Sequence, residues 1–345
     1  MERKNAWTTY EGKDLIELTD LTEDYKEFLS SGKTERECVR QSVKMAQKAG
    51  YRDLEEMIHN REELKPGDKV YRTWMEKAIV LFQIGKEPLE AGMNILGAHI
   101  DSPRLDLKQN PLYEDTEMVL LDTHYYGGVK KYQWVTLPMA LHGVVVKKDG
   151  TRIDICIGEK EDEPVVGVTD LLIHLSGKQM EKKASVVVEG EDLNVLIGSR
   201  PLKGEEKDAV KKQMTDLLKE EYNIEEEDFL SAEIEVVPAG RARDFGLDRS
   251  MVISYGQDDR VCAFTSLAAM LNVEEPERTS CCILVDKEEI GSVGATGMHS
   301  RFFENTVAEV MALNGSYSEL VLRRTLQNSY MLSSDVSAAL DPNYP

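Results

Sequence analysis

The chain has 345 residues, which exceeds the usual size of one domain and favours two domains, each with its own hydrophobic core. Its 63 Asp and Glu residues outnumber 42 Lys and Arg residues, and the net charge of −21 argues against nucleic acid or an anionic membrane as partner. No apolar run reaches the ~18 residues of a membrane span. Five cysteines without a Cys-x-x-Cys pair are interpreted as reduced thiols of a cytoplasmic protein.

Helices and short apolar strands alternate in the first hundred residues. Residues 1–62 are predicted to be mainly helical, with a long helix from Thr34 to about Ala49. The apolar runs at 77–85 and 92–100 are bounded by glycine and proline, which is typical of buried strands. This part of the chain therefore predicts the start of an α/β core.

The pattern changes between about residues 110 and 250, where short strands dominate. Residues 141–158 contain a strand, an Asp-Gly turn and a second strand, which predicts a β-hairpin. We expect further strands in four segments: 117–135, 184–190, 193–198 and 231–240. Only one charged amphipathic helix is expected here, at about 204–221. The segment is interpreted as a β-rich domain inserted into another domain.

Alternation of helix and strand returns after residue 250. The expected elements are a helix at 259–271, a strand at 280–287, a helix at 300–314 and a strand at 328–335. Helix and strand alternation on both sides of the β-rich segment predicts a doubly wound α/β sheet that is interrupted once. The predicted boundaries are 1–108 and 249–345 for the two parts of this core and 109–248 for the inserted domain.

Acidic residues and a histidine recur where core strands are predicted to end, at the edge where open α/β sheets bind ligands. They are His99, Asp101, Asp258, Asp259, Glu288, Glu289 and Asp335. Taken singly, they fit a turn, a helix cap and a solvated loop. Together, so many carboxylates would repel one another unless divalent ions bound them. The pattern predicts a two-metal site in which a separate carboxylate acts as general base.

Six motifs follow one another along the chain. They are GAHIDSP (97–103), DTHYYGG (122–128), LLIHL (171–175), GQDDRV (256–261), EEIGSVGATGM (288–298) and SSDVSAALDPNYP (333–345). With them, the chain from KTERE at 33–37 to its last residue resembles the aspartyl aminopeptidase family of dinuclear metallopeptidases. The resemblance implies a mixed sheet of the zinc-exopeptidase type and hydrolysis of the N-terminal residue of peptides, with Asp or Glu suggested by the family name. It also implies a dimerisation role for the inserted domain and a large hollow homo-oligomer, a dodecamer.

The resemblance also implies roles for individual residues. The implied metal ligands are His99, Asp258, Glu289 and Asp335. Asp258 would bridge two divalent ions, zinc by resemblance, although cobalt or manganese also suits such a ligand set. Glu288 would be the general base, Asp101 would orient His99, and Asp259 would brace or cap the following helix. The sequence leaves open whether the two residues of each acidic pair exchange roles.

His174 of the inserted domain matches a family position that reaches the active site of a neighbouring subunit and contacts the substrate. The alternative is a core histidine on an apolar strand. The family's second histidine ligand has no counterpart, because none of the six histidines follows Asp335, and His299 is a poor substitute. We therefore expect a chain that lacks its C-terminal end. Two other functions stay open: a related dinuclear aminopeptidase or deacylase without acidic preference, and a catalytically silent subunit.

Overall fold

The computed structural model describes residues 4–344 and divides the chain into two compact units. The first unit runs to Asp101 and resumes over Arg241–Glu288 and from Ser292 onward. The second unit consists of Ser102–Gly240 with Glu289–Gly291. The domain boundaries drawn at residues 108 and 248 remain predictions. Pro345, the last residue of the final motif, lies outside the described residues.

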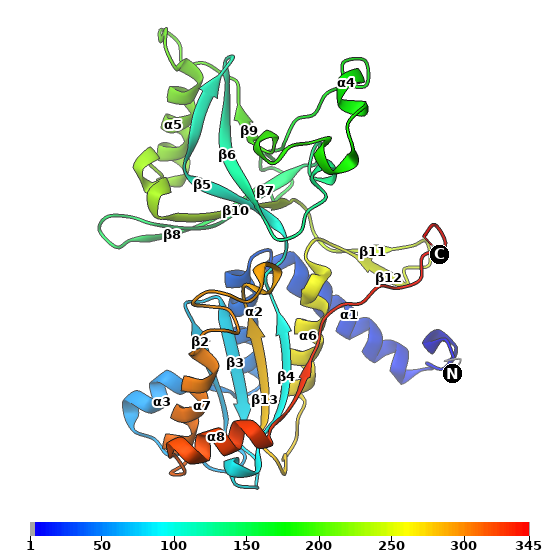
Figure 1. The fold of residues 1–345 in the computed structure, drawn as a ribbon, viewed down its shortest axis with the longest axis vertical. Helices are drawn as coiled ribbons and strands as arrows, with labels where there is room; N and C mark the ends of the chain where they lie inside the picture. The colour runs from blue at the N-terminus through cyan, green and yellow to red at the C-terminus, as the bar shows by residue number, and fades with distance from the viewer. Residues whose placement is uncertain (1–3, 345) are drawn as a thin grey trace. The chain divides into compact units, whose positions relative to one another are not determined.

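The first unit is built on a mixed six-stranded sheet with the order β1-β2-β3-β13-β4-β14 (Figure 1). Its strands are β1 (Arg52–Asp53), β2 (Lys69–Trp74), β3 (Ala78–Gln83), β4 (Asn94–His99), β13 (Ser280–Val285) and β14 (Tyr330–Ser333). Strand β4 pairs in parallel with β13 and β14, whereas β3 is antiparallel to both its neighbours. The central strands are continuous apolar runs because both of their faces are buried.

Helices cover both faces of this sheet. On one face, α1 (Lys13–Ser31), α2 (Glu35–Lys48) and α6 (Gln257–Leu271) share a core with the sheet. On the other face, α3 (Leu54–Asn60), α7 (Phe302–Leu313) and α8 (Glu319–Asn328) form a second core. Neighbouring residues of β13 point to opposite faces, so Cys281 packs in one core and Cys282 in the other. The predicted α/β class with a doubly wound mixed sheet is confirmed.

A two-stranded sheet of β11 (Arg243–Phe245) and β12 (Met251–Ile253) precedes α6 in the first unit.

Short 3-10 helices occupy Ala6–Thr8, Leu89–Ala91, Lys131–Gln133, Ala184–Val186, Gly190–Asp192, Glu226–Ser231 and Glu288–Ile290 across the chain. Among residues 4–344, no helix is both long enough and apolar enough to cross a membrane.

The second unit is a six-stranded antiparallel sheet with the order β8-β7-β10-β5-β6-β9. Its strands are β5 (Arg104–Asp115), β6 (Met118–Tyr126), β7 (Met139–Val146), β8 (Arg152–Ile157), β9 (Val195–Gly198) and β10 (Ala232–Pro238). Helix α5 (Ala209–Tyr222) packs its apolar side into the core of this unit, and α4 (Gly177–Met180) is a single turn. The hairpin predicted at 141–158 is formed by β7 and β8.

One predicted strand is wrong, and several elements were not predicted, among them β2, β5 and α8. The segment 184–190 contains the 3-10 helices Ala184–Val186 and Gly190–Asp192 in place of a strand. Its three consecutive valines have a high β propensity, but only Val188 of the three is buried, so no alternating face forms. Strand β2 and helix α8 were missed because their polar residues obscure the periodicity of their buried side chains.

Candidate metal centre

Three of the predicted groups lie at the carboxyl ends of neighbouring parallel strands. His99 is the last residue of β4 and pairs in register with Val285, the last residue of β13. Glu288 follows three residues later and begins the 3-10 turn η7 (Glu288–Ile290). Asp335 comes two residues after the end of β14. Parallel pairing therefore brings residues from distant parts of the sequence to one edge of the sheet.

Asp258 and Asp259 reach this edge by a different route. They stand in the first turn of α6, both with non-helical backbone angles, and the strand before them, β12, belongs to the separate two-stranded sheet. The prediction that they follow a core strand is therefore wrong. Helix α6 packs against β4, and this packing places its first turn beside the end of that strand.

The side chains of the first unit form overlapping groups of ligand atoms. His99 Nε2 lies 3.5 Å from Asp258 Oδ1 and 3.7 Å from Glu288 Oε2. In one group, ligand atoms of His99, Glu288 and Asp335 all lie within 4.8 Å of one another. In another, those of Asp258, Asp259 and Asp335 do so. Imidazole nitrogen and carboxylate oxygen are the donors that bind zinc in catalytic sites, so the set suits divalent ions.

Asp101 holds the His99 ring from the side opposite Asp258. His99 Nδ1 lies 3.3 Å from Asp101 Oδ1 and 3.0 Å from the Asp101 carbonyl oxygen. Burial alone lowers the pKa of His99, but the hydrogen bond and charge of Asp101 outweigh it and raise the pKa to about 9. Asp101 Oδ1 also accepts a hydrogen bond from the Glu288 amide at 3.2 Å. One buried carboxylate thus links the ends of β4 and β13.

Asp259 is fully buried beside Asp258. Neither of its carboxylate oxygens has a hydrogen-bond partner of ordinary geometry among the described residues, so the side chain does not cap α6, contrary to one expectation. Burial raises the pKa of Asp259 to about 6, and the nearby Cys262 thiol, a weak donor, opposes this only in part. A buried carboxylate with no stronger donor than a thiol is costly unless a cation balances it. This unsatisfied group fits bound divalent ions.

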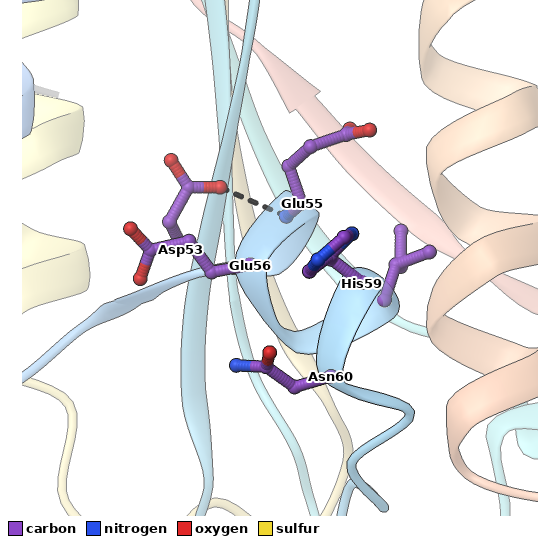
Figure 2. Close-up of a pocket in the computed structure, with 6 residues that line it drawn as sticks. Asp53, Glu55, Glu56, His59 and Asn60 are labelled. Carbon is purple, nitrogen blue, oxygen red and sulfur yellow. Dashed lines mark hydrogen bonds between the residues drawn. The ribbon is translucent and has the colours of Figure 1, made fainter.

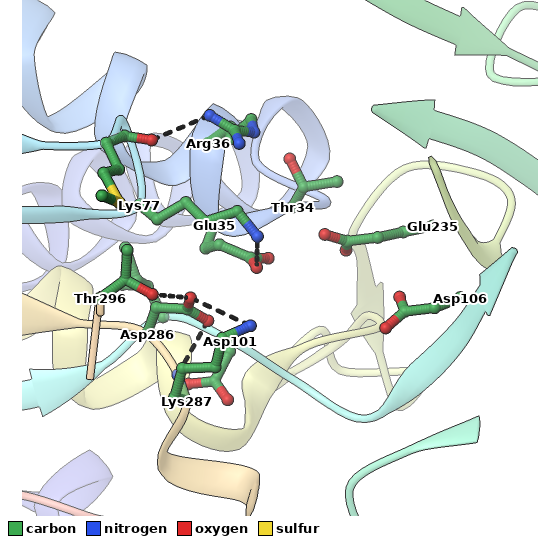
Figure 3. Close-up of polar contacts among 12 residues, drawn as sticks. Thr34, Glu35, Arg36, Lys77, Asp101, Asp106, Glu235, Asp286, Lys287 and Thr296 are labelled. Atoms are coloured by element: carbon green, nitrogen blue, oxygen red, sulfur yellow. Dashed lines mark hydrogen bonds and ion pairs between the residues drawn. The ribbon is translucent and has the colours of Figure 1, made fainter. Parts of the chain in front are cut away.

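Buried polar contacts surround Asp286, which directly follows β13 and precedes Glu288 by two residues (Figure 3). Asp286 Oδ2 accepts a hydrogen bond from Thr296 Oγ1 at 2.5 Å, and Lys77 Nζ forms a buried ion pair with Glu35 Oε1 at 2.9 Å. Burial and then the charge of Glu35 raise the pKa of Asp286 to about 6. The sequence analysis missed this network, because no spacing rule connects positions 35, 77 and 286. Its one local signal is an aspartate directly after an apolar strand.

The structure places the remaining predicted residues as follows. Glu289 is the second residue of η7. Residues Glu289–Gly291 belong to the second unit. Glu289 packs closely against Gly127 of that unit, because a Cβ added to Gly127 would stand 3.2 Å from the Glu289 Cβ. His174 lies on an exposed turn of the second unit, so its interpretation as a core histidine on a strand is wrong. His299 is exposed and belongs to none of the ligand groups found among the described residues.

A pocket of the first unit is also lined by acidic residues, and these have a structural role in the adjoining helix (Figure 2). It is lined around the start of α3 by Asp53, Glu55, Glu56 and His59, among others. Asp53 Oδ1 accepts a hydrogen bond from the Glu55 amide at 2.8 Å and so caps the helix. Acidic residues in a first turn also interact favourably with the helix dipole. None of the four belongs to a ligand group within residues 4–344.

Comparison with known proteins identifies the family. The family described as aminopeptidase I zinc metalloprotease (M18) matches residues 28–345, nearly the whole chain. The chain belongs to the M18 family. Membership confirms the predicted class of enzyme, a zinc metallo-aminopeptidase that hydrolyses peptides.

Similar M18 proteins agree in sequence and in fold. A probable M18 family aminopeptidase 1 of Clostridium acetobutylicum is 62% identical, covering 100% of this chain and 74% of the relative. The crystal structure of an M18 aminopeptidase from Thermotoga maritima has a TM-score of 0.92 and 44% identity, covering 100% of this chain and 74% of that one. A structure of the S. cerevisiae mApe1 dodecamer shares the fold with a TM-score of 0.72. Its chain is 18% identical in sequence, and the match covers 94% of this chain and 73% of that one.

Proposed function

We propose that this M18 protein is a two-metal aminopeptidase whose site lies at the carboxyl ends of β4 and β13. The proposed metal ligands are His99, Asp258, Glu289 and Asp335. The observation that carries the proposal is the buried carboxylate of Asp259, which has no hydrogen-bond partner of ordinary geometry among the described residues and adjoins Asp258 and Asp335. Carboxylates gathered in this way repel one another unless cations lie between them.

Each ligand has a proposed place. Asp258 would be shared by the two ions, His99 and Asp335 would hold one of them, and Glu289 would hold the other. Zinc is the metal of the family, and cobalt or manganese also suits mixed imidazole and carboxylate ligands. When bound, such ions would lower the pKa of a water and polarise the scissile carbonyl group.

Glu288 moves the proton in the proposed reaction. Its carboxylate accepts a proton from water while the water oxygen bonds to the carbonyl carbon. Glu288 then passes this proton to the amine nitrogen as the carbon–nitrogen bond breaks, which releases the N-terminal residue. Asp101 accepts from His99 Nδ1 and so leaves Nε2 free to bind a metal ion.

The substrate is proposed to be a peptide with a free N-terminus, with Asp or Glu as the preferred first residue. His174 would contact it from a neighbouring copy of the chain. Four apolar residues share its turn and are all more than half exposed, namely Leu171, Leu172, Ile173 and Leu175. Exposed apolar side chains in one stretch are typical of surfaces that other chains cover. Self-association through the second unit, up to a dodecamer like that of the distant yeast relative, follows from this proposal.

The cysteines support a cytoplasmic location. All five are free thiols, at positions 38, 156, 262, 281 and 282. Cys281 and Cys282 are fully buried, and their burial raises the pKa of both thiols. Free thiols are the common state of cysteine in reducing compartments.

Metal removal tests the proposed function. Dialysis against a chelator should abolish hydrolysis of aminoacyl substrates, and zinc, cobalt or manganese should restore it. Elemental analysis of the restored protein should find two ions per chain, and substrates with N-terminal Asp or Glu should be cleaved faster than those with Leu. Magnesium, which prefers oxygen ligands, serves as the control ion. Full activity after chelation would contradict the metal mechanism, and one ion per chain would contradict the two-metal site.

Replacing His174 tests its contact with substrate. The substitution His174→Ala should lower kcat/KM by about 10- to 100-fold, because a hydrogen bond to a charged group contributes about 1.5–3 kcal/mol. Metal content should stay the same. The matched control His59→Ala removes a histidine of the first unit at α3 and should leave kcat/KM unchanged. Equal kinetics for the His174 variant and the wild type would remove this residue from the proposed site.

A further inference from the structure

Arg260 connects two elements that carry proposed metal ligands. It stands two residues after Asp258, in α6, and its side chain is fully buried. Its Nε donates a hydrogen bond to the Ile100 carbonyl at 3.1 Å, and Nη2 donates to the Lys33 carbonyl at 3.0 Å. The Tyr255 ring lies 5.3 Å from the guanidinium carbon. The guanidinium therefore ties the first turns of α6 to the end of β4.

Ile100 is held from two directions. Its amide donates to the Val285 carbonyl at the end of β13 at 2.8 Å, and its carbonyl accepts from Arg260. His99 and Asp101 are its two chain neighbours. Rotation or displacement of this peptide would move the imidazole and the carboxylate that contacts it. The bond from Arg260 thus acts on the placement of His99 through the Ile100 peptide.

Gly256 makes room for the guanidinium. Its φ is +77°, a region that favours glycine, and its φ and ψ are those of a left-handed residue before α6. A Cβ at this position would stand 2.2 Å from Arg260 Nη1 and 2.9 Å from Cζ. The motif Gly256-Gln-Asp-Asp-Arg260 therefore contains the proposed bridging carboxylate of Asp258 and the arginine that is hydrogen-bonded to the end of β4. Its glycine leaves the space that the guanidinium needs.

We infer that Arg260 is a positioning residue that sets the separation between His99 and Asp258, an inference that rests on the proposed two-metal site. Arginine suits this task because its planar fork donates to two carbonyl groups in different directions. A lysine would keep the positive charge but has a single point of donation on a flexible stem. The charge alone is thus insufficient, and the geometry of the fork carries the effect.

Zinc affinity tests this inference without relying on turnover. In competition with a chromogenic chelator, Arg260→Lys should bind zinc about 10- to 100-fold more weakly than the wild type. Mutation of residues that support metal ligands typically has an effect of this size. Far-ultraviolet circular dichroism should show a native fold. Excess zinc should restore part of kcat. Unchanged zinc affinity in a folded Arg260→Lys protein would overturn the inference, even if its melting temperature fell.

Two further variants sharpen the test. Gly256→Ala keeps the arginine but displaces its guanidinium, so it should weaken zinc binding in the same direction as Arg260→Lys. Arg278→Lys is the matched control, because Arg278 also donates to a backbone carbonyl, that of Asn328, and stacks on a tyrosine, Tyr330, before the start of β13. Its zinc affinity should equal that of the wild type. Absence of zinc binding by the wild type would refute the proposed function itself, whereas equal binding by all variants would refute only the role of Arg260.

Discussion

The substitution Glu288→Gln is expected to lower kcat by about 10²- to 10⁴-fold, the usual contribution of a general base. Glutamine keeps the shape of the side chain but cannot accept the proton from water. The Glu288 amide, which donates to Asp101, is unaffected by the change, so the turn should keep its place. Two metal ions per chain should remain, and KM should change little. Steady-state kinetics together with elemental analysis measure both effects.

The neighbouring glutamate provides the matched comparison. Glu289→Gln should lose metal first and activity as a consequence, because Glu289 is the proposed ligand. Glu288 Oε2 lies 3.7 Å from His99 Nε2 and belongs to a ligand group with Asp335, so a ligand role for Glu288 is the competing assignment. Loss of metal from Glu288→Gln with metal retained in Glu289→Gln would exchange the two roles.

The central architecture of the first unit could be predicted from local patterns. Strands β3 and β13 are short apolar runs between breakers, and this signal depends only on neighbouring residues. The same holds for the helix α2, whose start is set by a capping box between Thr34 and Glu37. Such elements carry their own start and stop signals. Segment 184–190 does not, and its valines suggested a strand that the structure lacks.

The placement of candidate residues could be predicted where they end a strand or closely follow it, as at His99, Glu288 and Asp335. It was misplaced where a helix supplies the residues, because the approach of α6 to β4 is a matter of tertiary packing. The supporting charges were invisible for the same reason. Arg260 meets the Ile100 carbonyl across a separation of 160 residues, and a backbone carbonyl has no sequence signature. Buried charged residues with backbone partners are therefore the part of a site that sequence analysis misses.

Asp258→Asn should empty both metal sites together. The proposed bridging carboxylate contributes to both ions, and asparagine keeps its volume while removing the negative charge that holds them. The metal content measured by elemental analysis should fall from two ions per chain toward none. Loss of a ligand that binds only one ion should leave the other ion bound. The variant should also lose the stabilisation that metal gives, about 2.7 kcal/mol at a metal concentration 100 times the Kd, as measured by thermal unfolding with and without zinc.

Asp259→Asn decides which aspartate of the pair bridges. Asp258 Oδ1 lies 3.5 Å from His99 Nε2, whereas Asp259 is fully buried. The Asp259 variant should therefore keep its ions more tightly than the Asp258 variant does. Asp20→Asn, on the exposed surface of α1, is the control and should retain both ions. Two ions in Asp258→Asn and none in Asp259→Asn would assign the bridging role to Asp259. The metal ions would then be the partners of its two carboxylate oxygens, which have no hydrogen-bond partner of ordinary geometry among the described residues.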